Sequence, residues 1–436
     1  MTRTGRLLGL VAALALVAGA CTGGDEADQD GATPEGSPEP VTITVWDYYG
    51  SATPIEPAIP TFEQEYPWIT VKYESIGWDA AHEKFTVVVS GGNPPDVATM
   101  DMTWVPTFGS NGLFADLKEV SGGELNGEPI ENQYAEGALE AMTLDDQYVT
   151  MLFDFDAYAL YYRADQFKKK GIEVPETWDE LLAAADQLAE DTDGDGENDK
   201  YLYGIASADC FHWCQFLFQS GGSILNEDGT AAAFNDEAGV AAFEMYKRLL
   251  DSGNGIYWTP DLGDDFTPGI KDETIGMFQD GPYYMGLLKD AAPEQEGKWR
   301  VAAAPQGEEP GSYLGGTGLS IPVNAEHPQE AWLFIQYMLR LEQQVGVFEY
   351  AGAAPATSTA IQTPELTEPD PYFGGQAPFP IFLDTMATAT HFPYVEQWDP
   401  IDVIIGEMVD AVMVGNKPPQ EALDAAAAEV NQELAG

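Results

Sequence analysis

Basic residues are scarce in this sequence, which has 18 lysines and arginines against 73 aspartates and glutamates. The resulting formal net charge of −55 makes binding to a phosphate backbone unfavourable, so nucleic acid is excluded as a partner. The acidic residues are spread along the chain rather than gathered in a tail. This distribution favours the hypothesis of a halophilic surface adapted to high salt, where screening weakens self-repulsion.

The sequence also lacks the common catalytic motifs. It has no Gly-x-Ser-x-Gly elbow, no His-Glu-x-x-His pair and no P-loop, and its four histidines are widely scattered. A secreted glycoside hydrolase with two catalytic carboxylates is an alternative. In a sequence with this many carboxylates, a catalytic pair cannot be recognised unless the distance between the two groups is known. These absences are modest evidence against an enzyme. We expect a protein that is not an enzyme and requires no cofactor.

Long apolar runs are absent after the first twenty residues. Leu7 to Ala20 form an apolar stretch of fourteen residues behind Arg3 and Arg6. The stretch is too short to cross a hydrocarbon core of roughly 30 Å, but it is typical of an export signal. Residues 1–20 are therefore predicted to be a signal peptide.

The signal ends in Ala18-Gly19-Ala20-Cys21, which resembles a bacterial lipoprotein signal. The alternative is an ordinary cleavage site with an incidental cysteine. We expect Cys21 to be lipidated and to anchor the exported protein to the outer face of the cytoplasmic membrane. Residues 22–40 have no aromatic or large aliphatic side chain, so residues 21–40 are predicted to be the anchor and a disordered tether.

Only two other cysteines occur, Cys210 and Cys214, on either side of Phe211-His212-Trp213. In an exported protein they can form a disulfide, although closing so short a loop stabilises little. We expect this bridge, with the role of holding Trp213 in place. Zinc is disfavoured because His212 is the one histidine nearby.

Strand-like and helix-like segments alternate in the sequence. Residues 41–46, 69–73 and 96–100 have strand patterns, with helical stretches at 59–66 and 80–90 between them. This order predicts an α/β fold with βαβ units and a parallel sheet. A chain of 436 residues is also long enough for two cores.

Helix signals continue along the rest of the chain. A capping box at Thr177–Glu180 predicts a helix start, Asn235 is expected to cap a second helix, and Pro328 to begin a third. Residues 419–434 are predicted to be helical.

Several further segments share an order and spacing that resemble a known family. They are Trp46-Asp47-Tyr48-Tyr49-Gly50, Pro94-Pro95-Asp96-Val97 with Asp101-Met102-Thr103-Trp104, Leu160 to Phe167, Pro175 to Leu182, Gly221 to Leu225, Gly281-Pro282-Tyr283 and Gly315 to Pro322. Together they resemble the family 1 extracellular solute-binding proteins of ATP-binding-cassette importers. Two positions depart from that pattern. Tyr283 stands where many relatives have a Trp, and the segment Ala354 to Ser358 lacks the Arg that relatives often have there.

The resemblance implies a periplasmic-binding-protein-like fold of two α/β lobes, a hinge and a ligand cleft that closes on its solute. We expect residues 41–155 with 302–355 in the N-terminal lobe and 156–301 with 356–436 in the C-terminal lobe. The implied function is capture of a carbohydrate, such as an oligosaccharide, by a monomer that delivers it to a membrane permease. A polyamine or another non-sugar solute is the alternative.

A sugar site needs aromatic platforms and charged hydrogen-bonding groups, and loop positions after strands supply both. The candidates for ligand binding are Asp47, Tyr48, Asp101, Trp104, Asp154, Asp156, His212, Trp213, Trp258, Tyr283 and the backbone around Gly316. Trp178 and Trp332 lie on amphipathic stretches and are assigned to the core, and Tyr161 and Tyr162 to packing.

A separate acidic loop matches part of a calcium-binding pattern. Asp191, Asp193, Asp195 and Asp199 occupy positions 1, 3, 5 and 9 of an EF-hand-type loop, with Gly196 at position 6. Leu202 stands where the bidentate Glu is required. The alternatives are a structural calcium ion and a solvated acidic turn.

Overall fold

Two mixed β-sheets with their covering helices make up the fold of residues 40–436, which form one structural unit. The computed structural model describes residues 38–50, 53–91, 93–207, 210–263, 265–386, 388–393 and 395–436. The predicted signal peptide, Cys21 and the tether up to residue 37 therefore lie outside the described residues.

The first sheet has the strand order β15-β8-β14-β3-β1-β2, with β16 beside β14. Its strands are β1 (Val41–Asp47), β2 (Ile69–Ser75), β3 (Val97–Asp101), β8 (Met151–Ala157), β14 (Ser312–Ser320), β15 (Ala354–Pro355) and β16 (Ala389–His391). β1 pairs in parallel with β2 and β3, as the βαβ pattern predicts. β14 runs antiparallel to β3 and β8, so the expectation of a wholly parallel sheet is wrong. The reason is that β14 enters this sheet after the chain has passed through the second one.

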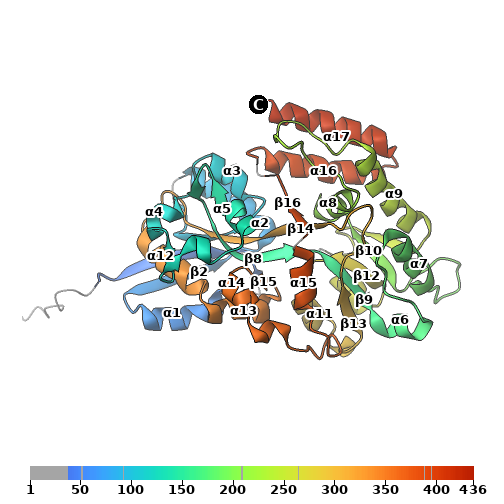
Figure 1. Cartoon of the computed structure of the whole chain (residues 1–436), viewed down its shortest axis with the longest axis horizontal. Coiled ribbons are helices and arrows are strands. Elements are labelled where there is room, and N and C mark those ends of the chain that lie inside the picture. The colour runs from blue at the N-terminus through green and yellow to red at the C-terminus, as the bar shows by residue number, and fades with distance from the viewer. Residues whose placement is uncertain are drawn as a thin grey trace, which may run out of the picture. The chain divides into compact units, whose positions relative to one another are not determined.

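The second sheet has the order β11-β10-β12-β9-β13. Its strands are β9 (Ala159–Arg163), β10 (Leu202–Ala206), β11 (Gly255–Trp258), β12 (Ile275–Asp280) and β13 (Trp299–Ala302). β8 leads directly into β9, so one continuous segment runs from the first sheet into the second (Figure 1). The stretch between β13 and β14 brings the chain back.

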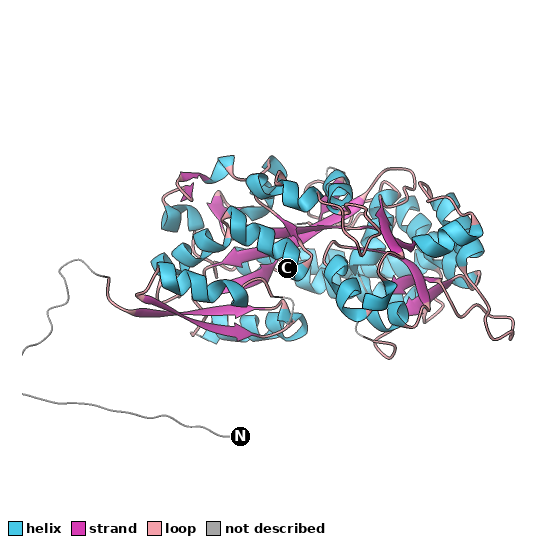
Figure 2. Cartoon of the chain, turned by 90° about the horizontal axis from the view of Figure 1, so that it is seen from below, coloured by secondary structure: helices cyan, strands magenta, loops and turns pink. Residues whose placement is uncertain are grey.

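Helices pack along the strands of both sheets (Figure 2). They are α1 (Ile59–Glu65), α2 (Trp78–Gly91), α3 (Val105–Ser110), α4 (Leu117–Ser121), α5 (Glu136–Met142), α6 (Ala164–Lys170), α7 (Trp178–Leu188), α8 (Cys210–Gln219), α9 (Glu237–Asp251), α10 (Thr267–Lys271), α11 (Tyr284–Ala291), α12 (Pro328–Met338), α13 (Leu341–Ala351), α14 (Ser358–Ile361), α15 (Phe379–Met386), α16 (Trp398–Met413) and α17 (Pro419–Leu434). Two small hairpins are also present, β4 (Glu124–Leu125) with β5 (Glu128–Pro129) and β6 (Thr143–Leu144) with β7 (Gln147–Tyr148).

Helix starts follow side-chain chemistry. At α7 the predicted capping box is present, because Thr177 Oγ1 accepts from the Glu180 amide and the Glu180 carboxylate accepts from the Thr177 amide. At α9 the predicted cap is wrong by one residue. Asp236 accepts from the first amides of the helix, while the Asn235 side chain donates to Asp424 on α17.

Each sheet has its own apolar core. Buried residues of 43–153 and 319–356 form one cluster around the first sheet, including Trp332. Buried residues of 158–313 and 392–430 form another beside the second sheet, with Trp178 packed against it. This separation is what two lobes require, and the lobe boundaries in the sequence stay a prediction.

Candidate ligand-binding site

Strands of both sheets bring five aspartates together. Asp47 ends β1 and Asp101 ends β3, and Thr317 on β14 pairs with Asp101 on one side and with Asp154 of β8 on the other. Asp156 follows two residues later on β8. Asp280 ends β12 of the second sheet, and its charge raises the pKa of Asp156. We call these five residues the aspartate cluster.

Asp47 and Asp154 are buried and well supplied with donors. Asp47 accepts hydrogen bonds from the Tyr73 hydroxyl at 2.7 Å and the Tyr49 amide at 3.0 Å. Asp154 accepts from the Thr317 amide at 2.9 Å and from the Tyr49 hydroxyl. Burial nevertheless dominates, and it raises the pKa of Asp47 to about 6 and that of Asp154 to about 7.

Asp280 and Asp156 differ sharply in their partners. Asp280 accepts from the Gly281 amide at 2.8 Å and from the Tyr283 hydroxyl, and its Oδ2 lies 3.3 Å from Nε2 of His212. Burial raises the pKa of Asp280, and the hydrogen bond and charge of His212 oppose that rise. Asp156 Oδ1 is buried and accepts no hydrogen bond among the described residues.

The environment of Asp156 penalises its charge. Burial raises its pKa well above the ordinary value, and the charges of Asp154, Asp101 and Asp280 raise it further. The side chain of Asp156 is half-buried, and its Oδ1 is the oxygen that lies away from the surface without a donor.

Aromatic rings border the aspartate cluster. Tyr48 and Trp104 meet edge to face at 5.6 Å, and the Tyr48 hydroxyl donates to Thr317 Oγ1 at 2.7 Å. Burial raises the pKa values of both Tyr48 and Tyr283, and the charge of Asp156 contributes to each rise. The structure therefore brings eight of the predicted residues together: Asp47, Tyr48, Asp101, Trp104, Asp154, Asp156, His212 and Tyr283.

Two predicted site residues have structural roles instead. Trp213 has no exposed surface and packs against Phe243, with ring centroids 5.1 Å apart. Trp258 is buried, and its indole donates to the Gly263 carbonyl at 3.1 Å. The backbone around Gly316 does lie at the cluster, since the Thr317 amide donates to Asp154 at 2.9 Å. Flanking a histidine or following a strand did not reveal that the rings of Trp213 and Trp258 face a core.

Residues that the sequence reasoning missed include Asp280 and Tyr49. Asp280 directly precedes the Gly281-Pro282-Tyr283 segment at the end of a strand, which is the rule that selected Asp47 and Asp101. Tyr49 lies in the first motif and donates to Asp154. Tyr158 was also missed, and its ring lies 5.1 Å from that of His212.

Two contacts join elements that belong to different cores. Nε2 of His82 on α2 lies 2.9 Å from Oδ2 of Asp399 on α16, and Thr107 Oγ1 donates to the Glu396 carbonyl at 3.0 Å. The His82 ring also meets Trp104 at 5.1 Å. Both contacts are partly exposed, and exposed pairs of this kind contribute only about 0–1 kcal/mol. Separating the two cores here therefore requires little free energy.

The predicted disulfide between Cys210 and Cys214 stays a prediction. Both cysteines are buried in α8, and their Sγ atoms are 3.0 Å apart, longer than a disulfide bond of about 2.05 Å. Residues four apart in a helix are separated by about one helical pitch of 5.4 Å, which lies within the Cα separations of about 4.4–6.8 Å that disulfides span.

The acidic loop after α7 is exposed. Carboxylate oxygens of Asp191, Asp193 and Asp195 lie within 4.8 Å of one another. Asp199 instead accepts from the amide and hydroxyl of Thr192, at 2.8 and 2.7 Å. The structural calcium ion stays a prediction. Calorimetric titration after chelation tests it, and no heat at millimolar calcium would rule it out.

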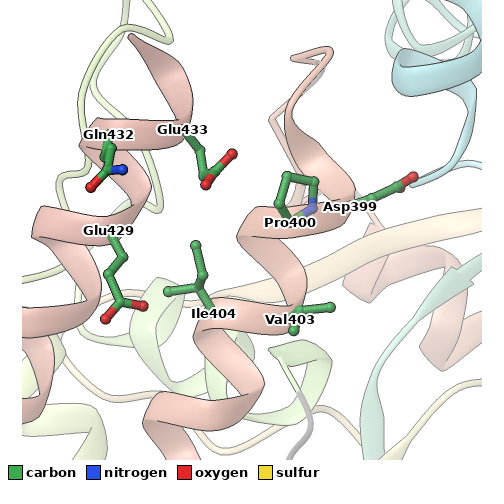
Figure 3. Close-up of a pocket in the computed structure, with 7 residues that line it drawn as sticks. All are labelled: Asp399, Pro400, Val403, Ile404, Glu429, Gln432 and Glu433. Atoms are coloured by element: carbon green, nitrogen blue, oxygen red, sulfur yellow. The ribbon is translucent and has the colours of Figure 1, made fainter. Parts of the chain in front are cut away.

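A surface groove of about 450 Å³ lies between α16 and α17 (Figure 3). It is lined by Asp399, Pro400, Val403, Ile404, Glu429, Gln432 and Glu433. This lining offers carboxylates and aliphatic side chains but no aromatic ring. The aspartate cluster, with its tyrosines and Trp104, is therefore the candidate for ligand binding.

Comparison with known proteins identifies the family. The model of the bacterial extracellular solute-binding proteins matches residues 58–372, more than half of the chain. The chain belongs to this family. The resemblance predicted from the ordered motifs is thereby confirmed. In the described part of this solute-binding protein, no helix is long and apolar enough to cross a membrane.

Relatives extend the comparison over most of the chain. The diacetylchitobiose-binding protein DasA of Streptomyces coelicolor is 25% identical over 407 residues, covering 90% of each chain. A solute-binding protein of Thermotoga lettingae, solved with α-D-tagatose, is 27% identical with a TM-score of 0.79, covering 90% of this chain and 99% of that one. The GacH receptor of Streptomyces glaucescens is 23% identical, with a TM-score of 0.80, and the match covers 90% of this chain and 98% of that one. These neighbours confirm the two-lobed α/β fold of the solute-binding protein.

Proposed function

We propose that this solute-binding protein captures a carbohydrate, in particular an oligosaccharide, at the aspartate cluster and delivers it to an ATP-binding-cassette permease. The observation that carries the proposal is the joining of carboxylates from both sheets with the rings of Tyr48, Trp104 and Tyr283. Carboxylates accept hydrogen bonds from sugar hydroxyls, and aromatic faces stack on the C–H faces of sugar rings. The relatives that bind diacetylchitobiose and tagatose support the same ligand class.

Binding by hinge closure follows from where these groups lie. Asp280 and His212 belong to the second sheet and its helices, whereas the other four aspartates belong to the first. A ligand that contacts both groups stabilises the closed arrangement and shifts the population towards it. The weak contacts at His82 and Thr107 let the lobes separate to admit the solute. We further propose that the protein acts as a monomer and performs no chemistry on its ligand.

Calorimetry on the mature protein tests the ligand class. We expect binding of at least one oligosaccharide, which should be recovered unhydrolysed. Asp101→Asn should weaken binding about tenfold, since it replaces a charge-assisted bond by a neutral one. Exposed Asp290→Asn is the matched control and should bind as the parent does. Binding of spermidine with no binding of any sugar would contradict the proposal, and hydrolysis of the sugar would favour a glycoside hydrolase.

We propose that residues 1–20 direct export and that a lipid on Cys21 holds the protein at the outer face of the cytoplasmic membrane. The extracellular family to which the chain belongs supports export, and the small residues before Cys21 support lipidation. Cys21→Ser should move the protein from the membrane fraction to the medium. An unchanged distribution would contradict the anchor.

A further inference from the structure

The aspartate cluster is short of positive charge. The titratable groups that interact with it or lie beside it are Asp47, Asp101, Asp154, Asp156, Asp280, His212, Tyr48, Tyr49, Tyr73, Tyr158, Tyr161 and Tyr283. His212 is the one of these that can become a cation near neutral pH, and it lies against Asp280. No lysine or arginine pairs with Asp47, Asp154, Asp156 or Asp280 in the described part of the chain. Any negative charge that Asp154 and Asp156 carry therefore has no lysine or arginine beside it in the described part of the chain.

The carboxyl of Asp156 has no positively charged partner among the described residues. The buried aspartates of the cluster, Asp47, Asp154 and Asp280, each accept hydrogen bonds from a tyrosine hydroxyl and a backbone amide. Asp156 has neither, although Asp154, Asp101 and Asp280 all act on its charge. A neutral hydroxyl from a sugar could supply a donor to Asp156. It would not offset the repulsion from three like charges, whereas a cation would do both.

The spacing of the carboxylates favours an ammonium group over a metal ion. In the part of the chain that the structure describes, three acidic side chains with oxygens within 4.8 Å of one another occur in the loop at Asp191, not in the aspartate cluster. A divalent ion draws its oxygen ligands to 2.0–2.6 Å. A protonated amine donates to oxygens at about 2.7–2.9 Å and also interacts favourably with tyrosine faces. Tyr48 and Tyr283, whose pKa values are raised by the charge of Asp156, are the candidate rings for this interaction.

We propose that the carbohydrate carries a basic nitrogen, and that its ammonium form donates to Asp156 between the two lobes. This inference rests on the proposed function and narrows the ligand class to amino sugars with a free amine. The amine supplies the donor and the positive charge that Asp156 lacks. The remaining hydroxyls of the ligand are left for the other carboxylates and rings of the site.

A proton-linkage effect follows from this arrangement. Burial and like charges raise the pKa of Asp154 to about 7 and that of Asp156 well above its usual range. A bound ammonium group lowers both pKa values, so its binding releases protons near neutral pH. A neutral sugar brings no charge and should release few. The affinity for the amino sugar should also rise from pH 5.5 to pH 7, because Asp154, with a pKa of about 7, ionises towards the upper end of this range.

The test is calorimetry of the mature protein with matched sugars, such as β-1,4-linked disaccharides of glucosamine, N-acetylglucosamine and glucose, extended to other linkages. We expect the amino form to bind at least tenfold more tightly than its hydroxyl and acetylated counterparts. Repeating the titration in buffers of different ionisation enthalpy should reveal proton release with the amino form. Asp156→Asn should remove the preference and the proton release, while Asp290→Asn should keep both.

The outcomes separate this inference from the proposed function. Equal binding of the hydroxyl and amino forms overturns the inference and leaves carbohydrate binding in place. Preference for the amine that persists in Asp156→Asn overturns the assignment to Asp156. Binding of spermidine alone, or of no sugar in any form, overturns both proposals. The proton-release measurement uses the parent protein, so it stays decisive even if Asp156→Asn does not fold.

Discussion

Gly316→Ala should destabilise the protein by about 2–5 kcal/mol, a large part of the 5–15 kcal/mol that typically separates folded from unfolded states. Gly316 has φ +142°, and a Cβ built there would lie 2.2 Å from the Asp154 carbonyl oxygen and 2.7 Å from Phe155 Cα. Both atoms belong to the backbone of β8, which pairs with β14 on this side. The strands would have to separate, because no flexible side chain can move away instead. Urea denaturation followed by circular dichroism measures the loss.

Gly375→Ala is the matched control for this substitution. Gly375 has φ +85°, but a Cβ at this position would have no neighbouring atom within 4 Å. Gly375→Ala should lower the free energy of unfolding by only about 1–2 kcal/mol, which is the cost of placing a residue with a side chain at this positive φ. Similar losses in the two variants would contradict the close approach of β14 and β8. Gly316→Ala should also weaken ligand binding, because Asp154 and Asp156 lie on the strand that it displaces.

The ligand-free protein should become less stable as the pH rises from about 4 to about 7. Burial raises the pKa of Asp154 from 3.8 to about 7, so the folded state holds a proton that the unfolded state has lost over this range. Stability then falls with pH, because the slope of the unfolding free energy follows the protons bound in the unfolded state minus those bound in the folded state. For Asp154 alone, the free energy of unfolding should fall by at most about 4 kcal/mol, at 1.36 kcal/mol for each pH unit.

Asp154→Asn isolates this contribution. Asparagine keeps an acceptor for the Thr317 amide but cannot ionise, so the fall in melting temperature between pH 4 and pH 7 should become shallower. Asp290→Asn should follow the parent, because this exposed aspartate belongs to the general surface charge. A parent curve that rises with pH, or equal slopes for Asp154→Asn and Asp290→Asn, would contradict the cause assigned here.

Local patterns predicted much of the fold because they depend on near neighbours. The first strands, the capping box at Thr177 and the helix start at Pro328 follow from alternation and backbone chemistry within a few residues. The cap of α9 was misplaced because the Asn235 side chain finds a distant partner, Asp424, that no local pattern contains. The direction of β14 was missed for the same reason, since it depends on where the chain returns from the second sheet.

The same distinction applies to the site. The expectation of loop positions after strands selected four aspartates of the cluster, Tyr48 and Trp104. In the structure Asp47 and Asp101 end their strands, whereas Asp154 and Asp156 lie within β8. The same expectation also selected Trp213 and Trp258, whose rings face a core. Asp280 satisfied the same rule but could not be recognised, since its contribution depends on the second sheet meeting the first.

By itself, the sequence determined the family, the α/β class and the acidic character of this solute-binding protein. These properties reside in ordered motifs, periodicity and composition, all of which are readable along one dimension. Only the tertiary structure decided that Asp156 is left without a donor among like charges, while Asp154 and Asp280 are satisfied by Tyr49 and Tyr283. The charges of Asp101, Asp154 and Asp280 reach Asp156 from three different strands, and Tyr49 binds Asp154 across 105 positions, so only the folded chain brings these groups together.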